Sequence, residues 1–387
     1  YIANKFVENG LPSPPVSVPH FASLIFRKSL DVELQKFPEP KLAIASYYGG
    51  KTTSRPGVYR DLTMYDVNSE YPSAIRKLPK MCCGEYKTVS EYQGPWGVYI
   101  LQDYKFLPCE YKTLYNNKIK MKNDSLTFLE EYTSGLIVNG WDVESAFLCG
   151  SLKINRCVGW KWQPRGCDHK NVFENYVDRF YLLRQQAKRD EDDIHSEFYK
   201  LLMNSLYGKF SQLRYNSQRQ GWQGGGLFDP LIAGWITAYG RYVIHSYEHQ
   251  YGSIYTSTDS IISSCKDVGT SEALGELKRE FTAAHVIIVR NKVFFAFDEH
   301  YNLLKCATHG LQADNVYDLI RAFGFNAKKI TKHKLIKRRE GIRRKITTGS
   351  SITRTQSLGT IVLPHGARLI FRRAWHTYKE GLPCPKN

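Results

Sequence analysis

The sequence has no apolar run of the roughly 18 residues that a membrane-spanning helix needs. Its most apolar stretch, His285 to Phe297, is interrupted by Arg290, Asn291 and Lys292, so we expect no membrane segment. We also find no initiator methionine, signal-peptide pattern, internal repeat or low-complexity tract. We therefore expect a soluble globular chain, cut from something longer, whose 387 residues are enough for two or three subdomains.

The cysteines show no pairing pattern. Nine are scattered along the chain, an odd number, and no two have the Cys-x-x-Cys spacing of common redox and zinc motifs. Reduced thiols in an intracellular, reducing compartment are the expectation. A zinc site from Cys157, Cys167 and His169 is conceivable from the residue types, but this spacing matches no standard finger.

Acidic residues are scarce toward the C-terminus. From Arg321 to Asn387 about 17 basic residues accompany only Glu340 and Glu380, so this segment holds about +15 of the formal charge of +17. Such a surplus indicates a polyanionic partner, either nucleic acid or an acidic membrane surface. The apolar stretches 358–363 and 369–371 favour a folded segment over a localisation signal or a solvated tail.

Local patterns predict the elements that carry the candidate site. Residues 58–67 read as a strand with Asp66 at its end, followed by a turn and a helix start at Pro72. Strand patterns at 96–101 and 151–157 flank a helical piece near 126–131.

Two helices in a hairpin follow, separated by the acidic cluster 190–193. On the second helix, Lys200, Asn204 and Tyr207 form one exposed stripe, and the opposite side carries Ile194, Phe198, Leu201, Leu202 and Ser205. After a glycine-rich loop at 221–226, Asp229 and Pro230 favour the start of a helix that runs to about His249. Strands 254–257 and 261–264 are joined by a tight turn that carries Asp259.

Two separated carboxylates and a basic stripe are what two-metal phosphoryl transfer needs. Carboxylate oxygens bind the metals, while a cation holds the triphosphate. Taken alone, each piece is weak evidence: a strand-end aspartate such as Asp66 is more often a turn former, and a helical lysine such as Lys200 is usually a solvated surface residue.

Three strings of residues, in this order, resemble motifs of family B DNA polymerases. Asp66-Val-Asn-Ser-Glu-Tyr71-Pro-Ser resembles the first palm motif, and Lys200-x-x-x-Asn204-Ser-x-Tyr207-Gly resembles the fingers motif. Tyr-x-Ser-Thr258-Asp259-Ser resembles the second palm motif. The five fixed residues of the fingers motif would recur by chance in roughly one sequence of this length per several thousand.

Further strings resemble the protein-primed branch of that family, found in certain phages, adenoviruses and linear plasmids. Tyr47-Tyr-Gly49-Gly50 is similar to its Tyr-x-Gly-Gly signature, which helps to hold primer and template. Arg-Asn-Lys292-Val-Phe294 is similar to its primer-gripping Lys-x-Tyr motif, and the string from Lys305 to Gly310 is similar to the palm segment that follows.

The resemblance implies an α+β right-hand polymerase: a palm with an antiparallel sheet, helical fingers, a basic thumb and an insertion resembling the first terminal-protein region. The implied segments are a lead-in with the Tyr-x-Gly-Gly segment (1–57), the first part of the palm (58–76), the insertion (77–171), the fingers (172–215), the second part of the palm (216–312) and the thumb (313–387). The thumb would grip duplex phosphates with cations that include Lys328, Lys329, Lys332, Lys334, Lys337, Arg338, Arg339, Arg343, Arg344 and Lys345.

The resemblance also implies roles for single residues. Asp66, Asp259 and the Val67 carbonyl would bind two Mg²⁺ ions, for which Mn²⁺ can substitute, and the two aspartates would be catalytic. Lys200 would contact the incoming dNTP, with Lys188 as a second cation assigned on position alone. The remaining expected contacts to the nucleotide are Tyr71, Asn204 and Tyr207, and to DNA they are Tyr47, Gly49, Gly50, Thr258, Lys292, Phe294 and Lys305. The expected partners are template-primer DNA, dNTPs and a terminal protein as candidate primer. The chain is expected to act as a monomer and to have no membrane partner.

The sequence departs from the family pattern at several points. Ser257 stands where the second palm motif normally has its first aspartate, which we expect to weaken metal binding more than abolish it. Phe294 replaces a tyrosine and lacks its hydroxyl. The 46 residues before Tyr47 cannot hold an exonuclease domain, so no proofreading is expected, and only about 20 residues stand where a second terminal-protein region would be. The alternative function is a catalytically degenerate polymerase fold that serves as a DNA-binding or assembly module.

Overall fold

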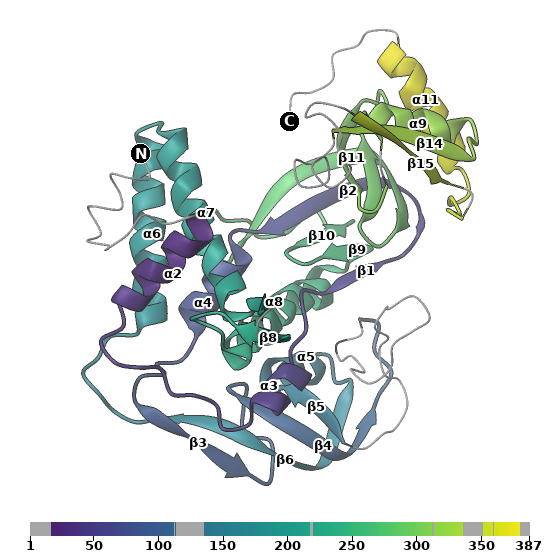
Figure 1. Cartoon of the computed structure of the whole chain (residues 1–387). Coiled ribbons are helices and arrows are strands. Elements are labelled where there is room, and N and C mark those ends of the chain that lie inside the picture. The colour runs from purple at the N-terminus through teal and green to yellow at the C-terminus, as the bar shows by residue number, and fades with distance from the viewer. Residues whose placement is uncertain are drawn as a thin grey trace. The chain divides into compact units, whose positions relative to one another are not determined.

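The computed structural model describes residues 17–111, 113, 135–216, 220–311, 313–335, 351–358 and 360–379 (Figure 1). The chain divides into two compact units, each assembled from segments that are distant in sequence. The first unit comprises Tyr1–Lys51, Val67–Gln250 and Ser271–Leu277, and the second comprises Thr52–Asp66, Tyr251–Thr270 and Lys278–Asn387. The helix expected near 126–131 lies outside the described residues.

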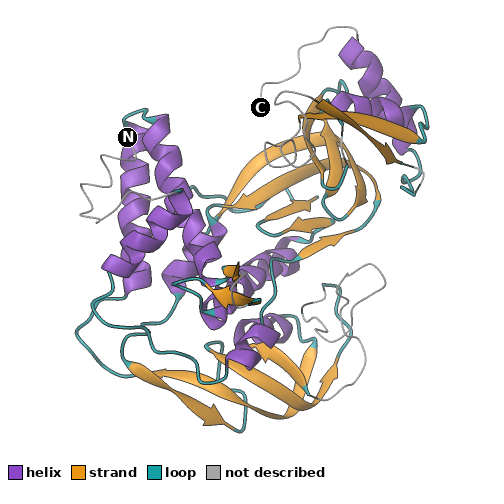
Figure 2. Ribbon diagram, in the orientation of Figure 1, coloured by secondary structure: helices purple, strands orange, loops and turns teal. Residues whose placement is uncertain are grey.

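Helices dominate one part of the first unit (Figure 2). They are α2 (Val18–Lys28), α3 (Pro40–Ala45), α4 (Glu70–Lys77), α6 (Val172–Arg189), α7 (Asp193–Phe210) and α8 (Pro230–Tyr251). The predicted hairpin of α6 and α7 is confirmed, and Asp192 caps α7 by accepting a hydrogen bond from the main-chain N of His195. Asp229 caps α8 as predicted, because its Oδ1 accepts from the main-chain nitrogens of Leu231 and Ile232.

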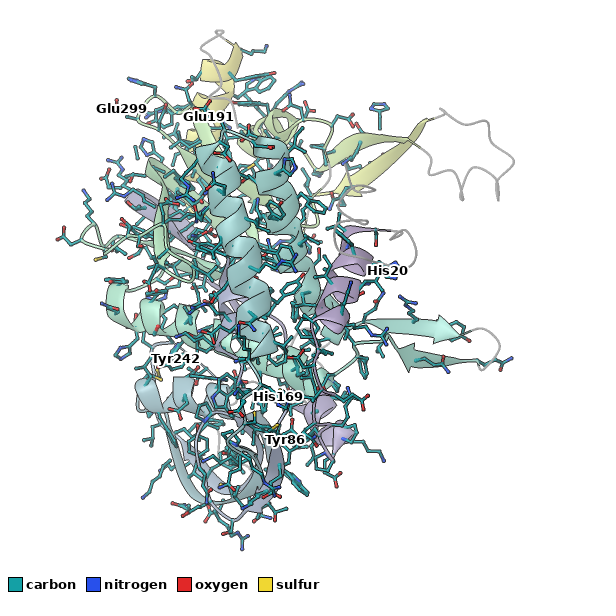
Figure 3. All side chains as sticks on the ribbon, turned by 90° about the vertical axis from the view of Figure 1, so that its left-hand side faces the viewer. His20, Tyr86, His169, Glu191, Tyr242 and Glu299 are labelled. Carbon is teal, nitrogen blue, oxygen red and sulfur yellow. The ribbon has the colours of Figure 1, made fainter. Side chains whose placement is uncertain are left out.

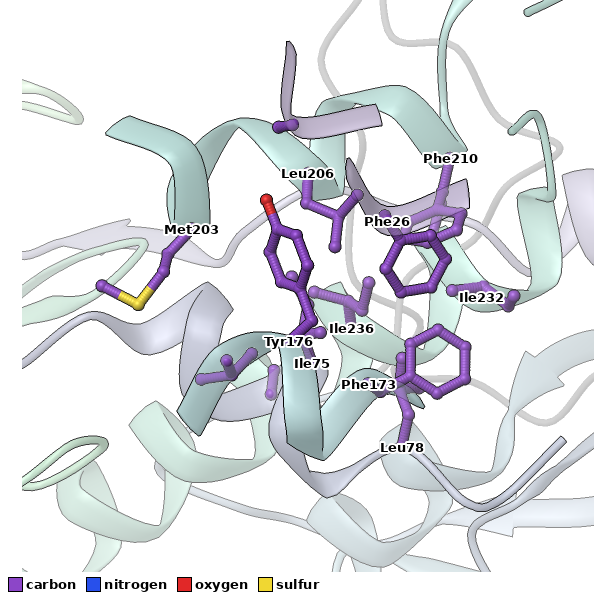
Figure 4. Close-up of a cluster of buried hydrophobic side chains, with 14 of the residues drawn as sticks. Phe26, Ile75, Leu78, Phe173, Tyr176, Met203, Leu206, Phe210, Ile232 and Ile236 are labelled. Atoms are coloured by element: carbon purple, nitrogen blue, oxygen red, sulfur yellow. The ribbon is translucent and has the colours of Figure 1, made fainter. Parts of the chain in front are cut away.

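An aromatic core holds these helices together (Figure 4). The ring of Phe26 lies 5.5 Å from that of Phe173 and 5.6 Å from those of Tyr176 and Phe210. Burying each such ring stabilises the fold by roughly 2 to 3 kcal/mol. Only one face of α7 packs against this core. Ile194 and Leu201, expected on the side opposite the polar stripe, lie off that face and are 72% and 43% exposed.

A four-stranded antiparallel sheet forms the rest of the first unit. Its order is β3 (Gly84–Val89), β6 (Leu152–Pro164), β4 (Gly97–Phe106) and β5 (Leu136–Asn139), and α5 (Gly140–Leu148) follows β5 in the chain. The strands predicted at 96–101 and 151–157 are confirmed within β4 and β6. Part of the expected glycine-rich loop is instead β8 (Gly221–Gly224), which pairs with β7 (Leu213–Asn216). Hydrogen bonding to β7 explains this difference, because glycine content indicates only local flexibility and does not reveal a partner strand.

The second unit is built on a seven-stranded sheet. The strand order is β1 (Thr52–Ser54), β9 (Tyr255–Ser257), β10 (Ser260–Ser263), β2 (Gly57–Val67), β11 (Leu277–Arg290), β12 (Val293–Phe297) and β13 (Leu303–Thr308). The predicted strand 58–67 and the predicted hairpin around Asp259 are therefore confirmed as β2 and β9–β10. All five residues of β12 are buried, which places this strand in the centre of the unit's core.

The basic C-terminal segment is folded where it is described. It contains α9 (Val316–Gly324), β14 (Lys329–Leu335), β15 (Ser351–Ser357) and α11 (Ala367–Lys379). Phe371 of α11 is fully buried, with its ring 5.1 Å from Phe295 and 5.4 Å from Phe323. The expectation of folding over a solvated tail is thus confirmed. Six of the cations expected in this segment lie outside the described residues: Lys337, Arg338, Arg339, Arg343, Arg344 and Lys345.

Within the part of the chain that the structure describes, no helix combines the length and the apolar character that a bilayer crossing requires.

Candidate functional site

Strand register brings Asp66 and Asp259 to one edge of the seven-stranded sheet. Asp66, near the end of β2, is directly opposite Ser260 of β10, and Ser260 is in turn opposite Ser257 of β9. Asp259 precedes Ser260 in a two-residue turn, where Thr258 adopts the left-handed conformation with φ of 55°. The main-chain N of Asp259 donates to the carbonyl oxygen of Ser257 over 2.7 Å, which closes the turn.

The surroundings of these carboxyls favour binding of a cation. Burial, and then the charges of Asp259 and Glu280, raise the pKa of Asp66 to about 6 against the opposing charge of Lys278. Burial likewise raises the pKa of Asp259 above its ordinary value. Two half-buried like charges destabilise each other, so a divalent cation bound between them would relieve the repulsion.

A row of alternating charges continues from Asp66 across the sheet. The Nζ atom of Lys278 lies 3.5 Å from Oδ2 of Asp66 and 2.9 Å from Oε1 of Glu280, and Nζ of Lys305 lies 2.9 Å from Oε2 of Glu280. Sequence reasoning selected Lys305 but missed Lys278 and Glu280. Nothing local distinguishes these two residues from ordinary surface residues of a strand. They are revealed only by the placement of β11 beside β2 and by the ion pair of Glu280 with Lys305 of β13.

The primer-gripping string is split between the surface and the core. Lys292 is exposed in the turn between β11 and β12, with φ of 58°. Phe294 is only 2% exposed, and its ring lies 5.1 Å from that of Tyr255 in the core. A direct contact of the Phe294 ring with DNA is incompatible with this burial. The ring instead supports β9, the strand that leads to Asp259.

In the first unit, three tyrosines from separate segments meet. The phenol oxygens of Tyr47 and Tyr207 are 2.6 Å apart, and the rings of Tyr71 and Tyr207 lie 4.6 Å apart at 44°. Burial, and then the hydrogen bond with Tyr47, raise the pKa of Tyr207, so its phenol stays protonated at neutral pH. The structure thus joins the Tyr-x-Gly-Gly segment, α4 and α7 at one point.

A buried arginine holds the Tyr-x-Gly-Gly segment. Nη1 of Arg241, on α8, donates to the carbonyl oxygens of Tyr48 and Gly49 over 2.8 and 2.7 Å. Its Nε and Nη2 donate to the carboxylate of Asp142, on α5, over 2.8 and 2.6 Å. Gly49 and Gly50 themselves are exposed. Sequence reasoning missed both members of this ion pair, because 99 positions separate them.

The expected cations on the α6–α7 hairpin are all accessible. Lys200 is 43% exposed and forms a surface ion pair with Glu197 over 3.2 Å, while Lys188 and Asn204 are exposed. Arg184, one turn before Lys188 on α6, donates from Nη1 to Oγ of Ser69 over 3.3 Å, within the first motif. Its spacing of four from Lys188 is the signal that could have identified it.

Val67 and Ser69 lie just before the start of α4. Ser69 has φ of 54° at the N-cap, and the side chain of Val67 is buried, so Val67 can offer only main-chain groups to a ligand.

Comparison with known proteins identifies a family to which the chain is similar. Residues 16–219, just over half of the chain, match the family described as DNA polymerase type B, organellar and viral. The chain is 25% identical over 325 residues to a DNA-directed DNA polymerase of Enterobacteria phage PRD1, covering 73% of this chain and 53% of the relative. It is 26% identical over 292 residues to a DNA polymerase of Acidianus bottle-shaped virus, covering 70% of this chain and 41% of the relative. The chain thus spans about half the length of these relatives.

Solved structures show the same fold. A Phi29 DNA polymerase crystal structure matches with a TM-score of 0.64 at 15% identity, covering 92% of this chain and 70% of that chain. A Phi29 DNA polymerase complex with primer-template DNA and incoming nucleotide substrates matches with a TM-score of 0.65 at 16% identity, over the same shares.

Proposed function

This chain belongs to the organellar and viral family of type B DNA polymerases, and we propose that it adds dNTPs to a primer 3′-hydroxyl under the direction of a template. One observation carries the proposal above the others: the register of β2, β9 and β10 brings Asp66 and Asp259 together at one sheet edge. Family membership indicates nucleotidyl transfer as the reaction class, and the carboxyls of Asp66 and Asp259 are groups that could bind the metal ions of such a reaction.

Asp66, Asp259 and the carbonyl oxygen of Val67 would hold the metals of this reaction. The fit rests on the raised pKa of both carboxyls, and on the lysine ammonium of Lys278, a cation that already lies 3.5 Å from Asp66. Two Mg²⁺ ions, or Mn²⁺ in their place, would supply activation of the primer hydroxyl and stabilisation of the charge that develops on pyrophosphate. Lys278, tied to Glu280, would keep Asp66 ionised and oriented.

We assign the nucleotide to residues of the first unit. Lys200, Lys188 and Arg184 would hold the triphosphate, since guanidinium and ammonium groups bind phosphate oxygens by charge-assisted hydrogen bonds. Asn204 and Tyr207 would flank the nascent base pair. Tyr71, whose ring packs on Tyr207, would lie beneath the deoxyribose and exclude a 2′-hydroxyl.

DNA would be held by a second set of groups. We propose contacts from Tyr47, Gly49, Gly50, Thr258, Lys292 and Lys305, and remove Phe294 from direct contact because its ring is buried. The folded basic segment that begins at 313 would grip duplex phosphates as a thumb. Binding should therefore weaken steeply as salt rises.

The six segments implied by the resemblance are proposed as functional parts, with their boundaries unchanged: 1–57 as the lead-in with the Tyr-x-Gly-Gly segment, 58–76 and 216–312 as palm, 172–215 as fingers, 313–387 as thumb and 77–171 as a terminal-protein-region-like insertion. Proofreading is not part of the proposal for these residues. The string Asp31-Val-Glu33 resembles the Asp-x-Glu motif of the family's exonuclease domain, but it is too short to count, and both acids lie in a loop between α2 and α3. A terminal protein is proposed as a candidate primer alongside nucleic acid.

Primer extension tests the proposal. The 387-residue chain should extend a primed template with Mg²⁺ or Mn²⁺, and Asp259→Asn should lose extension by about a thousandfold or more while still binding duplex DNA. The matched control is Asp267→Asn, an exposed aspartate of the same unit, which should keep full activity. A folded wild-type chain that incorporates no nucleotide with either metal would refute catalysis.

Ser257 favours one second candidate, a catalytically degenerate polymerase that binds DNA or assembles a complex. The two functions separate in a single comparison of extension and DNA binding. Salt-sensitive DNA binding without extension, unchanged by Asp259→Asn, would identify the binding module.

A further inference from the structure

A cluster of metal-binding side chains in the first unit contains none of the residues assigned to polymerisation. Its members are Cys82, Cys83, Cys167 and His169, whose ligand atoms all lie within 4.8 Å of one another. We propose that this cluster is a structural zinc site. The three cysteines are free, and His169 is labelled in Figure 3.

The spacing of the ligand atoms fits a tetrahedral zinc ion. Around a zinc ion with Zn–S bonds of about 2.3 Å, two sulfur atoms lie about 3.8 Å apart, and a sulfur and an imidazole nitrogen about 3.6 Å apart. The Sγ atoms of Cys82 and Cys167 are 3.6 Å apart, and Sγ of Cys83 lies 3.4 Å from Nδ1 of His169. Three thiolates and one imidazole form a ligand set that selects zinc over the hard cations Mg²⁺ and Ca²⁺.

The main chain around the cluster is already fixed. Cys82 and Cys83 follow α4 and directly precede β3, while Cys167 and His169 lie between β6 and α6. Gly84 of β3 is paired with Pro164 of β6, and the main-chain N of Arg165 donates to the carbonyl oxygen of Cys83 over 3.0 Å. The ligand-bearing loops are thus held together by groups that do not depend on a metal.

The charge of the site is also compensated. Three thiolates and a neutral imidazole leave a zinc site with one net negative charge. Nζ of Lys80 donates to the carbonyl oxygen of Cys167 over 2.9 Å, so a positive charge lies beside the cluster. Such outer contacts orient the ligands and stabilise the thiolate form.

The position of the site defines its role. The ligands enclose residues 84–166, which are most of the insertion, and they lie where this segment leaves and rejoins the helical core. Nδ2 of Asn171 donates to the carbonyl oxygen of Leu78 over 2.8 Å, which ties the end of α4 to the start of α6. A bound zinc would close the insertion at its base and fix α4, the helix that carries Tyr71.

Sequence reasoning combined the wrong cysteine with Cys167 and His169. Cys157 is buried in the separate core of the four-stranded sheet, with Tyr99 and Tyr104. The true companions are 85 positions from Cys167 and stand side by side, a spacing that no finger pattern describes.

Metal analysis of the whole 387-residue chain tests the proposal. Chain produced in zinc-supplemented medium and kept reduced should carry about one zinc per molecule. Cobalt replacement should give the intense visible bands of tetrahedral Co²⁺ and a thiolate charge-transfer band. A folded, reduced chain that takes up neither metal would overturn the proposal, as would recovery of a disulfide between Cys82 or Cys83 and Cys167 in a chain that stays metal-free after reduction.

Variants identify the ligands. Cys167→Ser and His169→Ala should lose the bound zinc and lower the Tm by about 5 °C or more, the size expected when a ligand present at about a hundred times its Kd is lost. His169→Cys should keep the metal because it restores a fourth ligand. Cys265→Ser, a thiol of the second unit, is the matched control and should keep both metal and Tm. Retention of zinc by Cys167→Ser and His169→Ala would refute the assignment; if these variants do not fold, the cobalt spectrum of the wild type decides.

Discussion

The phenol oxygens of Tyr47 and Tyr207 lie 2.6 Å apart, although 160 positions separate the two residues in the chain. This bond joins the segment before β1 to the last turn of α7, and the ring of Tyr71 packs on the same Tyr207. The position of one tyrosine therefore depends on two others.

Tyr207→Phe removes the hydroxyl and keeps the ring. We expect a loss of about 1 kcal/mol from the missing hydrogen bond, seen as a roughly three- to tenfold rise in KM for the incoming dNTP with little change in kcat. Single-nucleotide incorporation measures both constants. Tyr181→Phe, which removes a phenol hydrogen bond to Glu272 elsewhere in the same unit, is the control. Equal KM values for the two variants would contradict the role of the bond.

Tyr71 should discriminate deoxyribose from ribose by its ring. Tyr71→Ala opens space beneath the sugar, so incorporation of ribonucleotides relative to deoxyribonucleotides should rise at least tenfold, a change of about 1.4 kcal/mol in selectivity. Tyr71→Phe keeps the ring and should keep the selectivity. Competition between rNTP and dNTP on one template gives the ratio, and a lack of difference between the two variants would count against a steric role.

The stability of the metal-free chain should depend on pH through Asp66. Its folded-state pKa is raised from 3.8 to about 6, so between these values the folded chain binds the proton more tightly than the unfolded chain. The free energy of unfolding therefore falls as pH rises through this range, and the full penalty is present above about pH 6.

Asp66→Asn should remove that penalty. A shift of two units corresponds to about 3 kcal/mol, which we reduce to roughly 1 to 2 kcal/mol because the side chain is 25% exposed and screened by solvent. We expect the variant to be more stable than wild type at about pH 7.5 in chelator, and nearly equal at about pH 4. Urea unfolding at both pH values tests this, with Asp267→Asn as control. The same difference at both values would exclude Asp66 as its source.

Ser257→Asp adds a carboxylate beside Asp259 in the turn of β9 and β10. We expect the Mg²⁺ concentration for half-maximal extension to fall by roughly tenfold, because a third negative charge strengthens cation binding. In chelator the same variant should be less stable than wild type at neutral pH, since three like charges repel. Ser264→Asp, an exposed serine just after β10, controls for added charge. A lower extension rate at saturating Mg²⁺ would contradict our account of this position.

The ion pair of Arg241 and Asp142 is buried, with side chains 3% and 5% exposed. Asp142→Ala leaves the guanidinium buried without its main partner, and we expect a loss of about 3 to 5 kcal/mol in the free energy of unfolding. The exposed pair of Lys200 and Glu197 is the contrast, since Glu197→Ala should cost less than about 1 kcal/mol. Chemical denaturation measures both, and similar losses would refute the importance of burial.

The elements with local signals could be predicted from sequence. The strand before Asp66, the cap at Asp229 and the turn at Asp259 each depend on residues within about four positions, and the structure contains all three. The order of the three motif strings that contain Asp66, Lys200 and Asp259 then indicated the family that the chain resembles.

Contacts between distant segments could not be predicted in the same way. Lys278 and Glu280 acquire their meaning only when β11 is placed beside β2, and the burial of Phe294 depends on which elements cover β12. Cys82 and Cys167 gave no spacing signal because the partners come together only through the pairing of β3 with β6. Hydrophobic patterning reports a face of one element, whereas these contacts depend on the identity of its neighbour.

The arginine of α8 has a practical consequence for exchanging parts between related polymerases. Arg241 uses its guanidinium nitrogens at once, two for Asp142 of the insertion and one for two carbonyl oxygens beside Tyr47. A graft of residues 84–166 from a relative would therefore have to bring an acid to the position of Asp142, or the recipient would carry a buried arginine without the carboxylate that Asp142 supplies here. Lysine at 241 would not rescue such a chimera, because its ammonium lacks the planar fork that serves both neighbours. The smallest segment that can be exchanged is thus the insertion together with Arg241 of α8.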